Sequence, residues 1–320
     1  MTIPISLLVD DGAPINMMFW HDTACDHPFL VPNSLVREFA GLCERFGVQG
    51  KFSVLPMPSG LGRIDGRLAH VPQRHLHTFL EIVRERIAPR FDISPEILTH
   101  FLAHRLAGGY HHLHEDEWVA RASVEEVTDY IALALRILAS VGLPATGVTS
   151  PWSTGIQHEK QYAEAVGRAQ WRVHRRRVTW YFLHVLGAGP GRAPWVSWRN
   201  PRTGQAVVSI PTTTDDAFWR TQRPYATTLR ASRVAAAAGV DALLTADGKG
   251  GRIRELVNQS CPVLLLTHWQ SLYSDGTCAG LWGLAKLLER LEKIFGAELA
   301  WTRCSRLAAQ AARSCPQTQP

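Results

Sequence analysis

The stretch Ile3-Pro4-Ile5-Ser6-Leu7-Leu8-Val9-Asp10-Asp11-Gly12, IPISLLVDDG at residues 3–12, decides the fold class. A mostly apolar run is followed at once by two acidic residues and a glycine. Such a run is typical of a buried strand, and the Asp and Gly residues favour a turn after it. In parallel α/β folds, functional side chains lie at the carboxyl ends of the strands. The stretch therefore predicts a first strand, 3–9, that delivers Asp10 and Asp11 to a site.

Similar runs recur along the chain and alternate with segments of helical periodicity. We expect about seven strands, at 3–9, 51–55, 93–99, 145–149, 179–184, 206–210 and 262–267. Strands that alternate with helices predict a parallel α/β fold, and this number over this length favours a barrel over an open sheet. We predict a single domain over residues 1–312 and a disordered tail over 313–320.

The composition narrows the class of protein. The chain has 320 residues, of which 46% are hydrophobic and 19% charged, as in ordinary globular proteins. The net charge is +6, but the densest basic run, 172–177, resembles a solvated face, so we expect no nucleic-acid partner. No apolar run approaches the ~20 residues of a membrane span. Six scattered cysteines and a first segment without the features of a secretory signal lead us to expect a cytoplasmic protein.

The segment SPEILTHFLAH, at residues 94–104, contains two histidines four residues apart. On a helix, these positions face the same way, whereas on a continuing strand they would be ~13 Å apart. A shared metal ion therefore requires the chain to turn just after His100. Adjacent aspartates at a strand end point to opposite faces, so one can bind a cation while the other acts as a base. Two histidines and one carboxylate would leave open positions for water, as in catalytic zinc sites. The simpler interpretations are that Asp10 and Asp11 form a polar turn and that the histidines have a structural role without a metal ion.

Other strand ends carry further candidates. Trp152 and Trp269 follow two strands and could form the wall of a binding site, with Pro151 and Asp216 nearby. Glu96 could orient a ligand, although an exposed carboxylate at the start of a strand is the simpler interpretation. The cluster at 111–116 contains His111, His112 and His114, each of which would replace His104 as a ligand if His104 lies elsewhere.

Several of these segments resemble motifs of the polysaccharide deacetylases, the NodB-homology enzymes, in the form of a divergent branch. LLVDDGAP is similar to their first motif, and the spacing of His100 and His104 is similar to their second. The stretch 147–152 falls where the third, Arg-x-Pro-Tyr-like motif would lie, but it has no arginine, and Thr149 stands near that place. Leu265 to His268 is similar to the last motif. The order and rough spacing fit residues 4 to 305.

The resemblance implies a distorted (β/α)7-type barrel, NodB-like, with one divalent metal ion, zinc for preference and Co, Mn or Ni as alternatives. By the same resemblance, Asp11, His100 and His104 would be the metal ligands. Asp10 would be the general base, and His268 the general acid that protonates the leaving amine. These roles form a coherent set around one amide carbon.

We therefore expect a metal-dependent hydrolase that cleaves a C–N amide bond by a metal-activated water. The expected substrate is an N-acetylated sugar-like molecule, an oligosaccharide or a small amide. Two alternatives remain open: a glycosidase or other carbohydrate-active enzyme that uses two carboxylates on the same barrel, and an inactive barrel that serves as a binding or assembly partner. The lost arginine keeps the second alternative open. We expect no membrane partner, and a homo-oligomer is left open.

Overall fold

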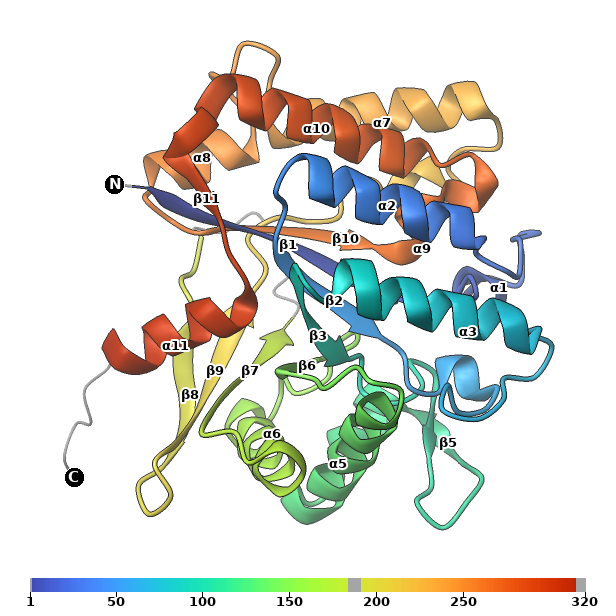
Figure 1. Ribbon diagram of the computed structural model, residues 1–320, viewed down its shortest axis with the longest axis vertical. Coiled ribbons are helices and arrows are strands. Elements are labelled where there is room, and N and C mark those ends of the chain that lie inside the picture. Colours follow the sequence, from blue (N-terminus) through green and yellow to red (C-terminus); the bar gives the residue numbers. More distant parts are fainter. Residues whose placement is uncertain (1, 184–190, 315–320) are drawn as a thin grey trace.

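The computed structural model describes residues 2–183 and 191–314 and consists of two sheets flanked by helices (Figure 1). The strands are β1 Ile3–Asp10, β2 Gly50–Val54, β3 Phe91–Pro95, β4 Leu102–His104, β5 Tyr110–His114, β6 Gly147–Thr149, β7 Val178–Leu183, β8 Trp195–Asn200, β9 Gln205–Pro211, β10 Val263–His268 and β11 Leu299–Trp301. The α-helices are α1 Met18–His21, α2 Asn33–Arg45, α3 Gln73–Ile82, α4 Glu115–Val119, α5 Val124–Ser140, α6 Glu159–His174, α7 Leu229–Leu243, α8 Arg252–Asn258, α9 Trp269–Tyr273, α10 Ala279–Phe295 and α11 Cys304–Ser314.

The first sheet is built around β1. This strand pairs in parallel with β10 on one side and with β2 on the other, and β3 continues the sheet beyond β2. β11 pairs with the first residues of β1. β2 and β3 are buried along their whole length, as expected for a parallel sheet that is covered on both faces.

The second sheet has the order β6-β7-β9-β8, and only β8 runs antiparallel to its neighbour. It meets the first sheet in two places, at the edge strand β6 and through the chain that follows β9. A single bridge joins Glu96, after β3, to Thr149 of β6. On the other side, Thr213 and Thr214 follow β9, and their hydroxyls accept hydrogen bonds from the backbone of β10. The carboxyl ends of seven parallel strands are thereby gathered at one rim.

The predicted α/β class with parallel strands is confirmed, whereas the barrel is not a closed one. Among the described residues, strand pairing stops between β3 and β6 and again between β9 and β10, so two sheets stand where a continuous ring was predicted. The third strand also ends earlier than predicted, at Pro95 and not at Thr99, because the chain turns there. Helix α11 continues to Ser314, and the rest of the predicted tail lies outside the described residues.

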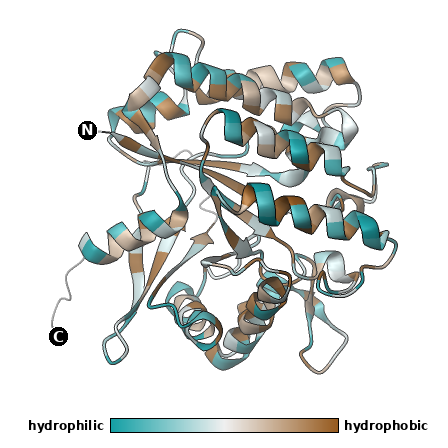
Figure 2. Cartoon of the chain, viewed as in Figure 1, coloured by the Kyte–Doolittle hydropathy of each residue, from teal (hydrophilic) through white to brown (hydrophobic). Residues whose placement is uncertain are grey.

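Two hydrophobic layers hold this arrangement together. Helices α2, α3 and α10 turn their apolar faces to the first sheet, and α6 does so to the second, with their hydrophilic faces outward (Figure 2). Between the sheets lies an inner cluster that includes Leu8, Phe182 and Leu266, to which α11 adds Cys304 and Leu307. Within residues 2–183 and 191–314, every helix is too short or too polar to cross a membrane.

A buried ion pair lies at the carboxyl end of this inner cluster. Lys51 Nζ contacts Asp10 Oδ1, and both side chains are fully buried. The same ammonium group donates a hydrogen bond to Thr149 Oγ1 at 3.0 Å and lies 4.3 Å from the centre of the Phe182 ring. Burial lowers the pKa of Lys51 to about 7, although the charge of Glu96 acts in the opposite direction. The resemblance would place an arginine near Thr149, and this sequence has none there. Lys51 of β2 places a cationic side chain beside Thr149.

We predict that Asp10→Asn destabilises the protein, because it leaves the Lys51 ammonium group buried without its counterion. The expected loss in the free energy of unfolding is about 3–5 kcal/mol. The double variant Asp10→Asn/Lys51→Met, which removes both charges, should recover most of this loss. Urea unfolding monitored by circular dichroism measures both changes. A double variant as unstable as the single one would contradict the ion-pair explanation.

Candidate active site

The turn after β3 places His100 at the rim. Within this turn, Ile97 and His100 have positive φ angles of 27° and 49°, which are strained for residues with a side chain. The buried carboxylate of Glu115 holds the turn by accepting backbone N–H groups from Leu98, Thr99 and His100 at 2.7–3.1 Å. Because these donors are satisfied by one rigid acceptor, the backbone keeps a conformation that it would not adopt alone.

Three potential ligand atoms converge in front of this turn. His100 Nε2 lies 3.4 Å from Asp11 Oδ1 and 3.6 Å from Glu96 Oε1, and the three atoms lie within 4.8 Å of one another. The other oxygen of each carboxylate is anchored. Gln270 Nε2 donates to Asp11 Oδ2 at 2.5 Å, while Ser53 Oγ and the Asp11 N–H donate to Glu96 Oε2. Neighbouring groups thus orient both carboxylates toward a common point.

The two converging oxygens carry a charge that no hydrogen bond compensates. Asp11 Oδ1 and Glu96 Oε1 are buried and lack a hydrogen-bond partner within the described part of the chain. Burial and the charge of Glu96 raise the pKa of Asp11 to about 6. Burial by itself would raise the pKa of Glu96 too, but the charges of His100 and Lys51 and two hydrogen bonds lower it to about 2. Buried carboxylate oxygens without a hydrogen-bond partner are suited to bind a cation.

The residues fit a divalent metal ion. Oxygen and nitrogen ligands lie at about 2.0–2.2 Å from zinc, which places neighbouring ligand atoms about 3–3.5 Å apart. The distances to His100 Nε2 are close to that range and too long for good hydrogen bonds. Two carboxylates and one imidazole suit Zn, Co, Mn or Ni. Asp11, Glu96 and His100 would therefore hold the ion, and Gln270 and Ser53 would orient its ligands.

The structure does not bring the predicted ligand His104 to this group. The chain turns at His100 as the metal hypothesis required, but His104 then lies in the β4–β5 hairpin, with its ring against Tyr110. The alternatives His111, His112 and His114 lie on β5 of the same hairpin, and they too are outside the group. Glu96, expected to be exposed, is fully buried and occupies the place that the resemblance gave to His104.

A second pair of residues faces the same space from β10. His268 Nδ1 lies 2.8 Å from Asp216 Oδ2, which also accepts a hydrogen bond from Ser271 Oγ at 2.6 Å. Burial lowers the pKa of His268, but the hydrogen bond and charge of Asp216, with the charges of Asp11 and Glu96, outweigh it and raise the pKa overall. Asp216, predicted as a substrate contact, thus favours the charged form of His268.

Both groups line one cavity of about 850 Å³. Its wall includes the aromatic residues His21, Trp152 and Trp219, and the Trp152 ring lies 4.3 Å from the ring of His100. Of the predicted wall residues, Trp152 therefore lines the cavity. Trp269 does not, because its ring packs in the core against Phe39 and Phe52, with Nε1 donating to a backbone carbonyl. Pro151 is buried beside Trp152 and does not line the cavity.

Three residues of the site were absent from the predicted set: Glu96 as a ligand, which does not itself line the cavity, and Gln270 and His21, which do. Glu96 and His100 have the same four-residue spacing as His100 and His104, so this signal was present in the sequence. His21 comes from α1 and packs beside His100 with a ring distance of 5.2 Å. Burial and the charges of His100 and His114 lower the pKa of His21 to about 3, so this imidazole stays neutral.

No family model matches this sequence, and no curated protein is similar to it in sequence. Two solved structures are distantly similar in fold. One is a mutant of BA3943, described as a CE4 family pseudoenzyme with restored enzymatic activity, at 10% identity and a TM-score of 0.42, covering 96% of this chain and 68% of that one. The other is the exo-β-1,4-mannosidase Op5Man5 from Opitutaceae bacterium strain TAV5, at 13% identity and a TM-score of 0.41, covering 91% of this chain and 59% of that one. Both likenesses are too distant to indicate a function for this chain.

We predict that Asp11→Asn, Glu96→Gln and His100→Ala each lose the ion bound at this centre. Removing one of three ligands should weaken its binding by at least about 100-fold. His104→Ala is the matched control and should bind the ion as tightly as the unchanged chain. Isothermal titration calorimetry with ZnCl₂ on metal-stripped protein measures the affinity. If Glu96→Gln binds zinc tightly and His104→Ala does not, the ligands are Asp11, His100 and His104, as the resemblance implies.

Proposed function

We propose that this protein is a divalent-metal-dependent hydrolase that cleaves a C–N amide bond, with an N-acetylated sugar-like molecule or a small amide as substrate. Its site would lie at the carboxyl end of a distorted, NodB-like (β/α)7-type barrel. The observation that carries the proposal is that Asp11 and His100, grouped with the buried Glu96, line the same cavity as the Asp216–His268 pair. Metal-assisted hydrolysis of an amide uses a cation that activates water and a general acid that protonates the departing amine. Residues suited to both roles face this cavity.

The ion, when bound, would act as a Lewis acid on the carbonyl oxygen and lower the pKa of water. The chain's own residues would do the rest. The carboxylates of Asp11 and Glu96 and the imidazole of His100 fix the position of the reacting groups. Trp152 and Trp219 offer apolar ring faces, which suit the C–H face of a sugar ring.

His268 is the proposed general acid. A departing amine needs a proton, and the carboxylate of Asp216 favours the imidazolium form of His268 that can supply it. Asp216 also fixes the ring orientation, because it accepts hydrogen bonds from both the His268 backbone N–H and Ser271 Oγ. Nε2, the ring nitrogen that does not face Asp216, would be the atom that donates the proton.

Asp10 is the proposed proton acceptor, in the role that the resemblance gives it. Its Cα pairs in register with that of His268, two residues nearer the carboxyl ends of the strands than the pair Leu8 and Leu266. Leu266 and His268 line the cavity, whereas Asp10 does not. The carboxylate of Asp10 is fully buried and contacts Lys51. A test of this role must separate proton transfer from the loss of that ion pair.

We predict that the metal-loaded chain releases acetate from N-acetylated monosaccharides, short oligosaccharides or small acetamides, and that the metal-stripped chain does not. The double variant Asp10→Asn/Lys51→Met should bind the ion but turn over about 10²–10⁴-fold more slowly, the usual contribution of a general base. A coupled acetate assay measures the rate.

The matched control for this experiment is Lys249→Met, which removes a lysine from an exposed turn and should leave the rate unchanged. Normal turnover in a stable double variant would remove Asp10 from the mechanism. Cleavage of a glycosidic bond without acetate release would favour the glycosidase alternative, and the absence of any turnover with the ion bound would favour the inactive barrel.

The pH dependence of kcat/KM tests the role of His268. Because the pKa of His268 is raised above its usual 6.5, activity should persist above that pH and fall as the imidazolium loses its proton. Asp216→Asn removes the stabilising charge, so the alkaline limb should move to lower pH and the maximal rate should fall. Asp241→Asn, a change at an exposed carboxylate outside the cavity, should leave the alkaline limb in place. An unchanged alkaline limb in Asp216→Asn would exclude the proposed pairing.

A further inference from the structure

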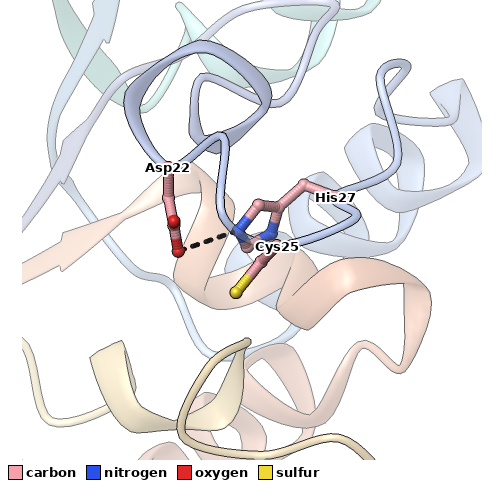
Figure 3. Close-up of side chains that lie close together, drawn as sticks. All are labelled: Asp22, Cys25 and His27. Carbon is pink, nitrogen blue, oxygen red and sulfur yellow. Dashed lines mark hydrogen bonds and ion pairs between the residues drawn. The ribbon is translucent and has the colours of Figure 1, made fainter.

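A second cluster of potential metal ligands lies in the loop that follows α1. Asp22, Cys25 and His27 lie close together there, with one ligand atom of each within 4.8 Å of the others. Figure 3 shows the Asp22 carboxylate, the Cys25 sulfur and the His27 ring on one side of the loop. His27 is buried, whereas Asp22 and Cys25 are partly exposed, so the cluster is open to an ion from solvent. None of these residues belongs to the cavity described above.

The His27 ring is held in one orientation by a residue far away in the sequence. Its Nδ1 lies 2.8 Å from Asp275 Oδ1, in the turn after α9. Asp275 is itself fixed, because it accepts hydrogen bonds from Asn16 Nδ2 at 3.2 Å and from the Arg223 backbone N–H at 2.9 Å. A carboxylate that accepts a hydrogen bond from Nδ1–H leaves the lone pair of Nε2 facing the other two ligands. This is the usual support for a metal-binding histidine.

The distance on the other side of the ring fits a shared ion better than a hydrogen bond. His27 Nε2 lies 3.3 Å from Asp22 Oδ2, whereas charge-assisted N–H···O bonds are about 2.7–2.9 Å long. Two ligands at about 2.0–2.1 Å from a tetrahedral zinc ion are separated by about 3.4 Å. His27 therefore makes a normal hydrogen bond to Asp275 through Nδ1. The distance from its Nε2 to Asp22 Oδ2 is that expected between two ligands of one metal ion.

We propose that Asp22, Cys25 and His27 bind a second metal ion, of the zinc class, with solvent in the fourth position. One oxygen, one sulfur and one nitrogen donor suit Zn²⁺, and the thiolate excludes Mg²⁺ and Ca²⁺. Binding would convert the Cys25 thiol to a thiolate and release its proton to solvent. The competing arrangement is a His27 ring that is hydrogen-bonded to both Asp22 and Asp275, with no ion.

The proposed ion would act on the wall of the cavity. The loop begins directly after α1, and the cavity is lined by Met17, Met18 and His21 from that region. At its far end, the His27–Asp275 contact ties the loop to the turn after α9, which follows Gln270. An ion at 22–27 would therefore fix α1 in place against the site.

Cobalt distinguishes the two centres, because only this one contains a sulfur ligand. The full-length chain, purified without a histidine tag and stripped of metal, is titrated with CoCl₂. The expected result is a sulfur-to-cobalt charge-transfer band in the near ultraviolet, which is complete by two equivalents in the unchanged chain and by one equivalent in Asp11→Asn, where the first centre is lost. The band should be lost in Cys25→Ala and Asp22→Asn and kept in Cys278→Ala, a change at the other partly exposed thiol. It should also be kept in Asp11→Asn, so failure of the catalytic proposal would not affect it.

Hydrogen exchange gives a second measurement that does not depend on cobalt. Zinc should slow amide exchange across residues 18–28 in the unchanged chain and in Asp11→Asn, but not in folded Cys25→Ala. An unchanged chain with no sulfur-to-cobalt band would overturn the proposal and leave His27 with its two carboxylate partners and no ion. A band that persists in Cys25→Ala would assign the thiolate to another cysteine and would overturn it equally.

Discussion

The burial of several carboxylates at one rim is the constraint on which the site depends. Asp10, Asp11, Glu96 and Asp216 all have side chains with at most a few per cent of their surface exposed. A buried carboxylate is costly unless a cation or a set of donors compensates it. Lys51 compensates Asp10, and Asp216 faces the His268 ring, whose pKa it raises. Asp11 accepts a hydrogen bond from the neutral donor Gln270, whereas Glu96 accepts one from Ser53 and is also influenced by the charges of Lys51 and His100. Under the proposed function, one divalent ion held with His100 would add the positive charge that allows the two carboxylates to lie side by side.

Much of the rim could be predicted because strand ends are visible in the sequence. Apolar runs followed by Asp10-Asp11, by Ser150 and by His268 do end at the same edge, so residues distant in the chain were expected to meet. The assignment of the third ligand could not be made this way. The spacings from Glu96 to His100 and from His100 to His104 are equal, and only the turn at residues 97–100 decides between them. That turn depends on Glu115, whose bonds to three successive N–H groups have no local sequence pattern.

The direction in which an individual side chain points was harder still to predict. Lys51 lies at the start of an apolar run, where a charged residue normally indicates an exposed position, yet it is fully buried against Asp10. Trp269 follows a strand end as directly as His268 does, but its ring turns into the core while the imidazole turns to the cavity. Neighbouring residues at a helix start point in different directions, and the sequence does not state which faces the site.

One short segment, residues 268–275, links the elements of the site. His268 ends β10 and carries the proposed acid, Gln270 in α9 anchors Asp11, and Asp275 in the following turn anchors His27. Ser271 adds a hydrogen bond to Asp216. Because α9 is a single turn of helix packed against the core through Trp269, these contacts cannot shift independently. A displacement of the segment would alter the metal ligands, the acid and the wall formed by α1 together, so the local rigidity of α9 sets how accurately the whole cavity is assembled.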